Sequence, residues 1–430
     1  MTENRTNRMK LTINVFLISL LGMMAGRTAC AQEALQWKDV VARTLEHQPQ
    51  LKGAALRINE ARQDQKISKS ALFPQISGSS AYRRSESSDT DWNGSYNHGL
   101  SGSMLIFDGL KTPYAVKAAG KRIDEQQFSY EVVSSDALQD IRAAFVELME
   151  SQELITLTRT IHDRKKQNLE LVQLRYEGGK EHRGAYLTAE AELAEAGFDV
   201  REAERNLTLS RRRLLIAMGF EEMETISVSG TFAISEPYSE KPDLNQILDR
   251  IPFLKQLAAA REASMYNNKS AKGDLWPTIK ATSSLGRSGE SFSGDEHDLS
   301  LGVSLSIPLF EGGRNLANIQ KSHISFLRAQ VTEQSGRQQV LLTLEDRWKR
   351  LMDAIETVAV RKKFLLATEE RAKIAAAQYG TGLIDFDDWI IIENNLVSAR
   401  KNFLFAQTGM LTAEAGWIHS LGGTLNEEIY

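Results

Sequence analysis

Apolar and small polar residues alternate strictly along residues 299–307. The apolar positions are Leu299, Leu301, Val303, Leu305 and Ile307, with serine or glycine between them. A strand with this pattern carries its apolar side chains on one face and only small or polar groups on the other. Soluble sheets and membrane strands can both have such a pattern, so the rest of the chain must decide between them.

A similar segment stands 203 residues earlier in the chain. The earlier segment ends in Phe-Asp-Gly at 107–109, and the later one ends in Phe-Glu-Gly at 310–312. The same offset relates Phe73-Pro74 to Trp276-Pro277, and it relates Tyr176 and Gly179 to Tyr379 and Gly382. We therefore predict two structural repeats, residues 32–228 and 229–430, each far longer than one unit of a solenoid.

Two long tracts, residues 114–236 and 309–430, contain no proline and are free to be helical. Apolar residues in both tracts step by three and four, and in the later part of each tract they recur every seventh residue. The heptad positions are Leu193, Val200, Leu207 and Leu214, matched by Leu396, Phe403, Met410 and Trp417. This spacing predicts coiled coils. Helices over 114–177 and 312–378 would be about 95 to 100 Å long, beyond the usual length in globular proteins.

Each repeat also predicts two strands, at about 76–84 and 96–106 in the first and 279–287 and 299–307 in the second. Their length of roughly 9 to 11 residues suits a tilted membrane strand. Aromatic residues that would form a girdle at the membrane boundary stand at the same end of all four strands: Phe73, Phe107, Trp276 and Phe310. The predicted fold class is therefore mostly α-helical with membrane β-strands.

Four strands cannot close a barrel, and open sheet edges are not tolerated in lipid. We therefore expect the chain to oligomerise. Two chains would supply eight strands, and side chains would just fill the interior of a barrel of that size. Three chains would supply twelve and leave an open lumen, which the small serine and glycine residues on one strand face would fit.

The N-terminal segment has the features of a secretory signal. A polar, basic start precedes an apolar core at 11–26, and Ala29-Cys30-Ala31 provides a cleavage site after residue 31. Cys30 is the only cysteine, so this cleavage would leave no thiol. The alternative is lipid attachment to Cys30, although Arg27 stands where lipoprotein sites have an aliphatic residue.

Composition and motifs give no support for catalysis or nucleic-acid binding. The net charge is −4, no hydrolase, zinc-protease or nucleotide-binding motif is present, and Met149, Met218 and Met223 are too dispersed for a soft-metal site. The nearest ligand cluster, residues 295–298 (Asp-Glu-His-Asp), is interpreted as a solvated loop rather than a metal site. We expect no enzyme activity, no cofactor and no resident metal.

Three carboxylates follow the second glycine turn, in Asp385, Asp387 and Asp388. Acidic residues at a helix start favour the positive end of the helix dipole, which is one interpretation. In a trimer each would instead form a ring of three carboxylates, and such a ring at a constriction selects for cations. The sequence leaves both interpretations open.

The signal peptide, the duplication, the Phe-Pro and Trp-Pro strand starts, the Phe-Asp-Gly and Phe-Glu-Gly-Gly strand ends and the Tyr-x-x-Gly turns together resemble the TolC-like outer membrane efflux proteins, over residues 35–422. The resemblance implies a homotrimer with a 12-stranded barrel in outer membrane lipid and a long helical tunnel through the periplasm. It also implies two partners, a periplasmic adaptor and an inner-membrane pump of the RND or ABC type. The implied function is a passive duct for efflux or type I secretion.

Aligned on Tyr379 and Gly382, Asp388 matches the first aspartate of the family's periplasmic entrance. Ile391 stands where a second aspartate is usual, Ile384 replaces an arginine of the closed-state latch, and Ala185 stands where that latch has an acidic partner. The resemblance thus implies the location of the gate, with Asp388, Asp385, Asp387 and Tyr379 as candidates, but not the details of its latch. The alternative function is a periplasmic coiled-coil adaptor or structural protein without its own pore.

Overall fold

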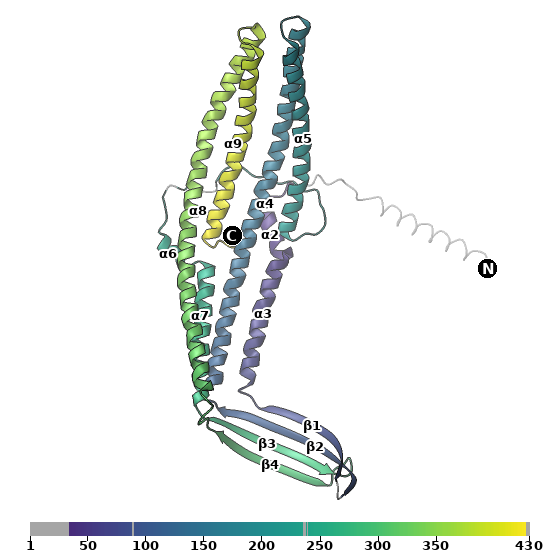
Figure 1. Cartoon of the computed structure of the whole chain (residues 1–430), viewed down its shortest axis with the longest axis vertical. Coiled ribbons are helices and arrows are strands. Elements are labelled where there is room, and N and C mark those ends of the chain that lie inside the picture. The colour runs from purple at the N-terminus through teal and green to yellow at the C-terminus, as the bar shows by residue number, and fades with distance from the viewer. Residues whose placement is uncertain (1–33, 88–89, 235–237, 239, 427–430) are drawn as a thin grey trace, which may run out of the picture.

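The chain is an elongated molecule in which long helices run from a four-stranded sheet to two hairpin turns at the far end (Figure 1). The structure is a computed structural model that describes residues 34–87, 90–234, 238 and 240–426. The predicted signal peptide, residues 1–31, and the choice between cleavage and lipid attachment at Cys30 lie outside the described residues. None of the described helices combines the length and apolar character of a membrane span.

The same order of elements occurs twice: helix, two strands, long helix, returning helix. The elements of the first half are α2 (Trp37–His47), α3 (Pro49–Ser70), β1 (Gln75–Ser87), β2 (Thr90–Phe107), α4 (Lys111–Glu177) and α5 (Arg183–Met218). Those of the second half are α6 (Leu244–Leu248), α7 (Pro252–Lys272), η1 (Gly273–Leu275), β3 (Thr278–Gly289), β4 (Glu296–Ser306), α8 (Arg314–Thr381) and α9 (Phe386–Ser420). The predicted fold class is confirmed.

Helix boundaries differ from the predicted ones by a few residues for a physical reason. α4 begins at Lys111, before Pro113, because a proline in the first turn of a helix removes only an N–H group that has no partner within the helix. The glycine two residues after β2 is required by both space and conformation. Gly109 has φ +69, and a Cβ atom there would stand 2.7 Å from the carbonyl oxygen of Gly273.

The four strands form one antiparallel sheet in the order β1-β2-β3-β4. The register between β3 and β4 places Ile279 opposite Leu305 and Ala281 opposite Val303 on one face. On the other face Ser284 lies opposite Ser300, with their hydroxyl oxygens 2.8 Å apart. The sheet therefore has one apolar face and one face of small polar groups, as the alternation predicts.

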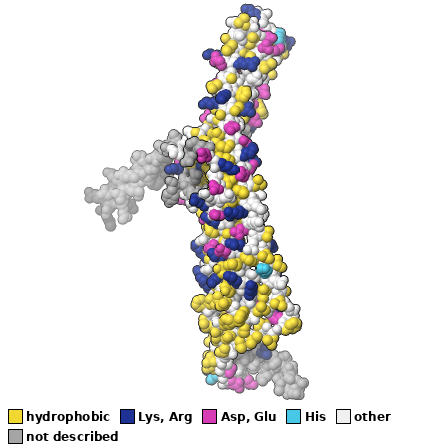
Figure 2. Space-filling model, turned by 90° about the vertical axis from the view of Figure 1, so that its left-hand side faces the viewer, with side chains coloured by type: hydrophobic (Ala, Val, Ile, Leu, Met, Phe, Trp, Pro, Cys, Tyr) yellow, Lys and Arg dark blue, Asp and Glu magenta, His cyan; other side chains and the backbone are white. Residues whose placement is uncertain are grey.

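Both sheet faces and both sheet edges are open in this single chain. Val303 on the apolar face is 72% exposed, and hydrophobic side chains gather over this end of the molecule (Figure 2). Within the described part of the chain, β1 pairs only with β2 and β4 only with β3. An exposed apolar face and two unpaired edges require a further covering, because each is unfavourable in water.

The helical core follows a heptad period, but its deepest positions are small residues. Along α5 the fully buried line is Ala189, Ala196, Ala203 and Ser210. Leu193, Val200 and Leu207, which the sequence singles out, are half-buried beside this line, and Leu214 is fully buried. A line of alanines lets α5 lie close against α4, where the Ser210 hydroxyl donates to the Ser151 hydroxyl at 2.9 Å. The predicted coiled-coil period is thus present in the structure.

Candidate functional site

The turns of the α4–α5 and α8–α9 hairpins lie at the end of the molecule opposite the sheet (Figure 1). The first turn spans residues 178–182 and the second spans 382–385. Gly382 ends α8 with φ +79, a conformation that favours glycine, and its N–H donates to the Tyr379 carbonyl oxygen at 3.0 Å. Tyr379, one of the predicted gate residues, is therefore held one turn before the reversal of the chain.

Tyr379 is fully buried between the two hairpins. Its ring stacks on Trp389 of α9, with centroids 4.2 Å apart and planes 8° apart. Its hydroxyl donates to Glu181 of the first hairpin turn, with 2.9 Å between the oxygens. The pKa of Tyr379 is raised, mainly by burial and to a smaller extent by this hydrogen bond. The hydroxyl therefore stays protonated at physiological pH and remains a donor to the carboxylate.

Arg175 completes this contact from the end of α4. Its guanidinium lies over the Tyr379 ring, 4.5 Å from the centroid, and donates to the Tyr379 carbonyl oxygen at 2.8 Å. Its Nε lies 3.7 Å from Glu181. Arg175, Glu181 and Tyr379 together form what we call the turn latch, which joins the first hairpin to the second.

The sequence alone did not reveal the turn latch. Ala185 stands where the family resemblance places an acidic partner, and it packs in the apolar cluster around Tyr379. The acidic partner is instead Glu181, four residues earlier. Residues 181 and 379 are 198 positions apart, and no local pattern indicates a pair at such a separation.

The three predicted aspartates have different positions at the start of α9. Asp385 is the N-cap residue, and its Oδ1 accepts a hydrogen bond from the Asp388 N–H at 2.9 Å. Asp385 thus stabilises the start of α9 as its N-cap, and the ring of carboxylates stays a prediction. Asp387 and Asp388 follow in the first turn, and all three side chains are exposed. Ile384 is half-buried and Ile391 is exposed. Both side chains are apolar, so neither supplies a polar group near Asp388.

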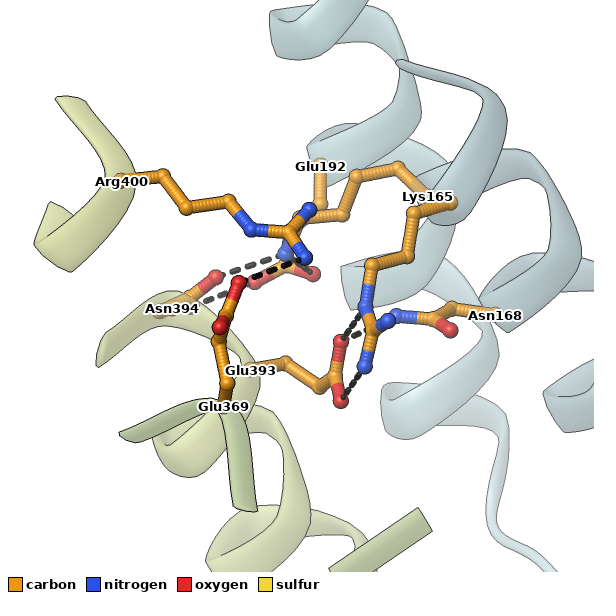
Figure 3. Close-up of polar contacts among 8 residues, drawn as sticks. Lys165, Asn168, Glu192, Glu369, Glu393, Asn394 and Arg400 are labelled. Atoms are coloured by element: carbon orange, nitrogen blue, oxygen red, sulfur yellow. Dashed lines mark hydrogen bonds and ion pairs between the residues drawn. The ribbon is translucent and has the colours of Figure 1, made fainter. Parts of the chain in front are cut away.

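A buried ion pair joins α4 to α9 further along the hairpins (Figure 3). Arg164 donates twice to Glu393, from Nε at 2.6 Å and from Nη2 at 2.8 Å, and Asn168 donates to the same carboxylate at 3.3 Å. Glu393 is only 1% exposed. Its hydrogen bond raises the pKa of Arg164, although that guanidinium is permanently charged in any case. A carboxylate can be buried here because three N–H groups solvate it.

A second set of polar contacts extends the junction to α5. Lys165 donates to Glu192 at 2.9 Å and to Asn394 at 2.6 Å, and Asn394 donates to Glu192 at 2.8 Å (Figure 3). Lys401 of α9 donates to Asp199 of α5 at 2.7 Å. These contacts fix the two hairpins relative to each other, and no cluster suited to a metal ion is found among the described residues.

The predicted boundary aromatics lie where the sheet meets the helices. Phe73, Trp276 and Phe310 are largely exposed, and Phe107 is half-buried. Their placement at one end of the sheet agrees with the sequence pattern. Their role at a membrane boundary stays a prediction.

Replacing Tyr379 with phenylalanine is expected to loosen the hairpin ends. The change leaves Glu181, whose side chain is 9% exposed, without its hydroxyl donor, at a cost of about 1 to 3 kcal/mol. Amide hydrogen exchange in both turns should accelerate accordingly. Tyr176→Phe is the matched control, because Tyr176 is the repeat equivalent and its hydroxyl forms no such bond in the described residues. Equal exchange rates in the two variants would contradict the assigned latch.

Comparison with known proteins agrees with this architecture. The model of the outer membrane efflux protein family matches residues 40–219 and 244–423. The outer membrane efflux protein BepC of Brucella suis is 23% identical over 357 residues, covering 81% of this chain and 78% of BepC. The outer membrane protein TolC of Escherichia coli K12 is 21% identical over 397 residues, covering 86% of this chain and 77% of TolC.

The fold is also found in solved channel structures. A crystal structure of CusC, described in terms of transmembrane channel formation, superposes with a TM-score of 0.83 at 16% identity, covering 91% of this chain and 93% of CusC. The two stretches that match the family model contain both hairpins and all four strands. The chain therefore belongs to the outer membrane efflux protein family.

Proposed function

We propose that this chain is the outer membrane channel of an export system and that three copies form the pore. The observation that carries the proposal is the sheet, whose apolar face is exposed and whose two edges are unpaired in the described chain. Three sheets of four strands joined edge to edge make a closed barrel of twelve strands, wide enough for a lumen. Two copies would give eight strands and no open passage.

In this arrangement the apolar face contacts outer membrane lipid and the serine and glycine face lines the lumen. The boundary aromatics Phe73, Phe107, Trp276 and Phe310 form the girdle on the periplasmic side. The helices continue the lumen as a tunnel: α8 has 68 residues, which corresponds to about 100 Å at 1.5 Å per residue. Residues 1–31 act as the export signal, and residues 32–228 and 229–430 form the two repeats.

The hairpin turns form the periplasmic entrance of this tunnel. Three copies bring three turn latches and three sets of Asp385, Asp387 and Asp388 around one axis. A periplasmic adaptor and an inner-membrane pump of the RND or ABC type deliver the cargo to this entrance, and the channel itself performs passive transport and no catalysis. The chain is 20% identical in sequence to the cation efflux system protein CusC of Escherichia coli O157:H7, which supports an efflux role.

Cell fractionation and native mass measurement test this function together. A channel should be found with outer membrane porins and should be extracted by detergent as a trimer that becomes monomeric only on heating. A periplasmic adaptor or structural protein would be released without detergent. Recovery of the full-length chain in the soluble periplasmic fraction would rule out the proposed channel.

Neutralising Asp388 is expected to have the largest effect on ion selectivity at the entrance. A ring of three carboxylates at a constriction attracts multivalent cations, because low-dielectric walls concentrate the field. In planar bilayers, Asp388→Asn should weaken block by a trivalent cation, added from the periplasmic side, by at least about tenfold.

The matched controls are Asp385→Asn and Asp387→Asn. Asparagine at 385 retains the cap on α9, so this variant changes charge without removing the hydrogen bond to the Asp388 N–H. Both controls should alter the block less than Asp388→Asn. Wild-type selectivity and block in all three variants would show that the aspartates only stabilise the start of α9.

A further inference from the structure

The four hairpin helices lie side by side in the order α8, α9, α4, α5, so α8 and α5 form the two outer edges (Figure 1). The junction between the hairpins is made mainly by α4 and α9, and α5 reaches it through the contacts of Glu192 with Asn394 and of Asp199 with Lys401. The offset of 203 residues that relates the repeats maps α4 onto α8 and α9 onto α5. The two outer edges are therefore the repeat equivalents of the two helices that form the internal junction.

Equivalent apolar residues are buried in the junction helices and exposed on the outer edges. Ile390 of α9 is buried, but its equivalent Leu187 of α5 is 47% exposed. Ile161 of α4 is buried, but its equivalent Phe364 of α8 is 60% exposed. Contacts within a hairpin are present in both repeats, so this difference in burial arises from the junction. Each outer edge thus exposes apolar residues at positions where its equivalent is covered.

Charged residues show the same relation. Glu393 is buried under Arg164 and Asn168, while its equivalent Glu190 is exposed. The equivalent of Arg164 is Ala367, which cannot pair with a carboxylate, but the equivalent of Asn168 is Arg371. In the second repeat the positive charge therefore stands at the position of Asn168, one helical turn after the position of Arg164 and on the same face of the helix. Neither Glu190 nor Arg371 forms a hydrogen bond or ion pair in the described part of the chain.

In the trimeric channel, the outer edge α5 of one copy lies beside the outer edge α8 of the next, and we propose that Glu190 pairs across this interface with Arg371 of the neighbouring copy. The proposal rests on the trimeric channel proposed above. Leu187 and Phe364 supply the apolar part of the interface, and the glutamate and arginine supply its register. The interface is head to tail, so a ring of copies closes without leaving either edge free.

Pairs of introduced cysteines test the pairing in the full-length protein. Glu190→Cys with Arg371→Cys, treated with a short bismaleimide in outer membranes, should give covalent dimers and trimers on denaturing gels. A pair within one chain, Lys401→Cys of α9 with Asp199→Cys of α5, whose side chains are half-buried and lie 2.7 Å apart, should crosslink within one chain and migrate as a monomer. The two single variants Glu190→Cys and Arg371→Cys should give no covalent oligomer, which also excludes crosslinks through Cys30.

Charge reversal provides the second measurement. Glu190→Arg should lower the temperature at which the detergent-extracted trimer dissociates, and adding Arg371→Glu in the same chain should restore most of the loss. A wild-type protein that is not trimeric would defeat the proposed function itself. A stable trimer in which the 190/371 pair forms no crosslink between chains, or in which charge reversal is not rescued, would overturn the pairing alone.

Discussion

Replacing Val303 with arginine is expected to prevent stable assembly of the barrel. Val303 stands at the centre of the apolar strand positions and is exposed on the apolar face of the sheet. An arginine on a lipid-facing site near the bilayer midplane costs about 2 to 4 kcal/mol per chain, and a trimer carries this cost in all three chains. The heat-stable trimer of Val303→Arg should therefore be largely lost from outer membranes.

Ser304→Arg is the matched control, because Ser304 is adjacent to Val303 and points to the other face. In the structure its hydroxyl donates to the Lys280 carbonyl oxygen at 3.4 Å, on the face that carries the serine pairs. An arginine there would lie in the water-filled lumen and keep its hydration. Trimer yield on unheated gels should stay near wild type, and equal yields for the two arginine variants would refute the assigned faces.

Removing the Glu393 carboxylate is expected to be the most damaging single change in the helical part. Glu393→Ala leaves Arg164 in the junction without its anion, and breaking a buried ion pair costs about 3 to 5 kcal/mol. Arg164 is 32% exposed, so water recovers part of this cost and the lower end of the range is expected. The thermal unfolding of the helices, followed by circular dichroism, should shift to lower temperature.

Two further variants separate the buried pair from surface charge effects. Asp346→Ala removes an exposed ion pair with Arg350, for which roughly 0.2 to 1 kcal/mol is expected. Arg164→Leu combined with Glu393→Leu should recover much of the stability, because replacing both partners leaves no uncompensated charge. Equal shifts for Glu393→Ala and Asp346→Ala would mean that Glu393 is not buried in the assembled protein.

Local patterns were sufficient to predict the elements of this fold. Alternation along 299–307 is a property of neighbouring residues, and the duplication repeats it at a fixed offset, so the strands and the long helices follow from the sequence. Alanine contributes little to a hydrophobic pattern, so the sequence pointed to the larger heptad residues. The structure shows that the small residues of α5, such as Ala196, form the deepest line.

The polar contacts between the hairpins could not be predicted in this way. Glu190 and Glu393 occupy equivalent positions in similar helices, yet only Glu393 is buried. The difference depends on Arg164, which is 229 residues away in the chain. Likewise, Tyr379 was predicted from its turn motif, but its partners Arg175 and Glu181 become evident only when the two hairpins lie together.

Electron cryo-microscopy of the full-length protein in a lipid nanodisc tests the central claim most directly. We expect three copies around one axis, with twelve strands inside the lipid belt, the serine and glycine face lining a lumen, and the helices outside the lipid on one side. A sheet that lies outside the lipid belt, or copies whose sheets do not join into a closed barrel, would contradict the proposed channel.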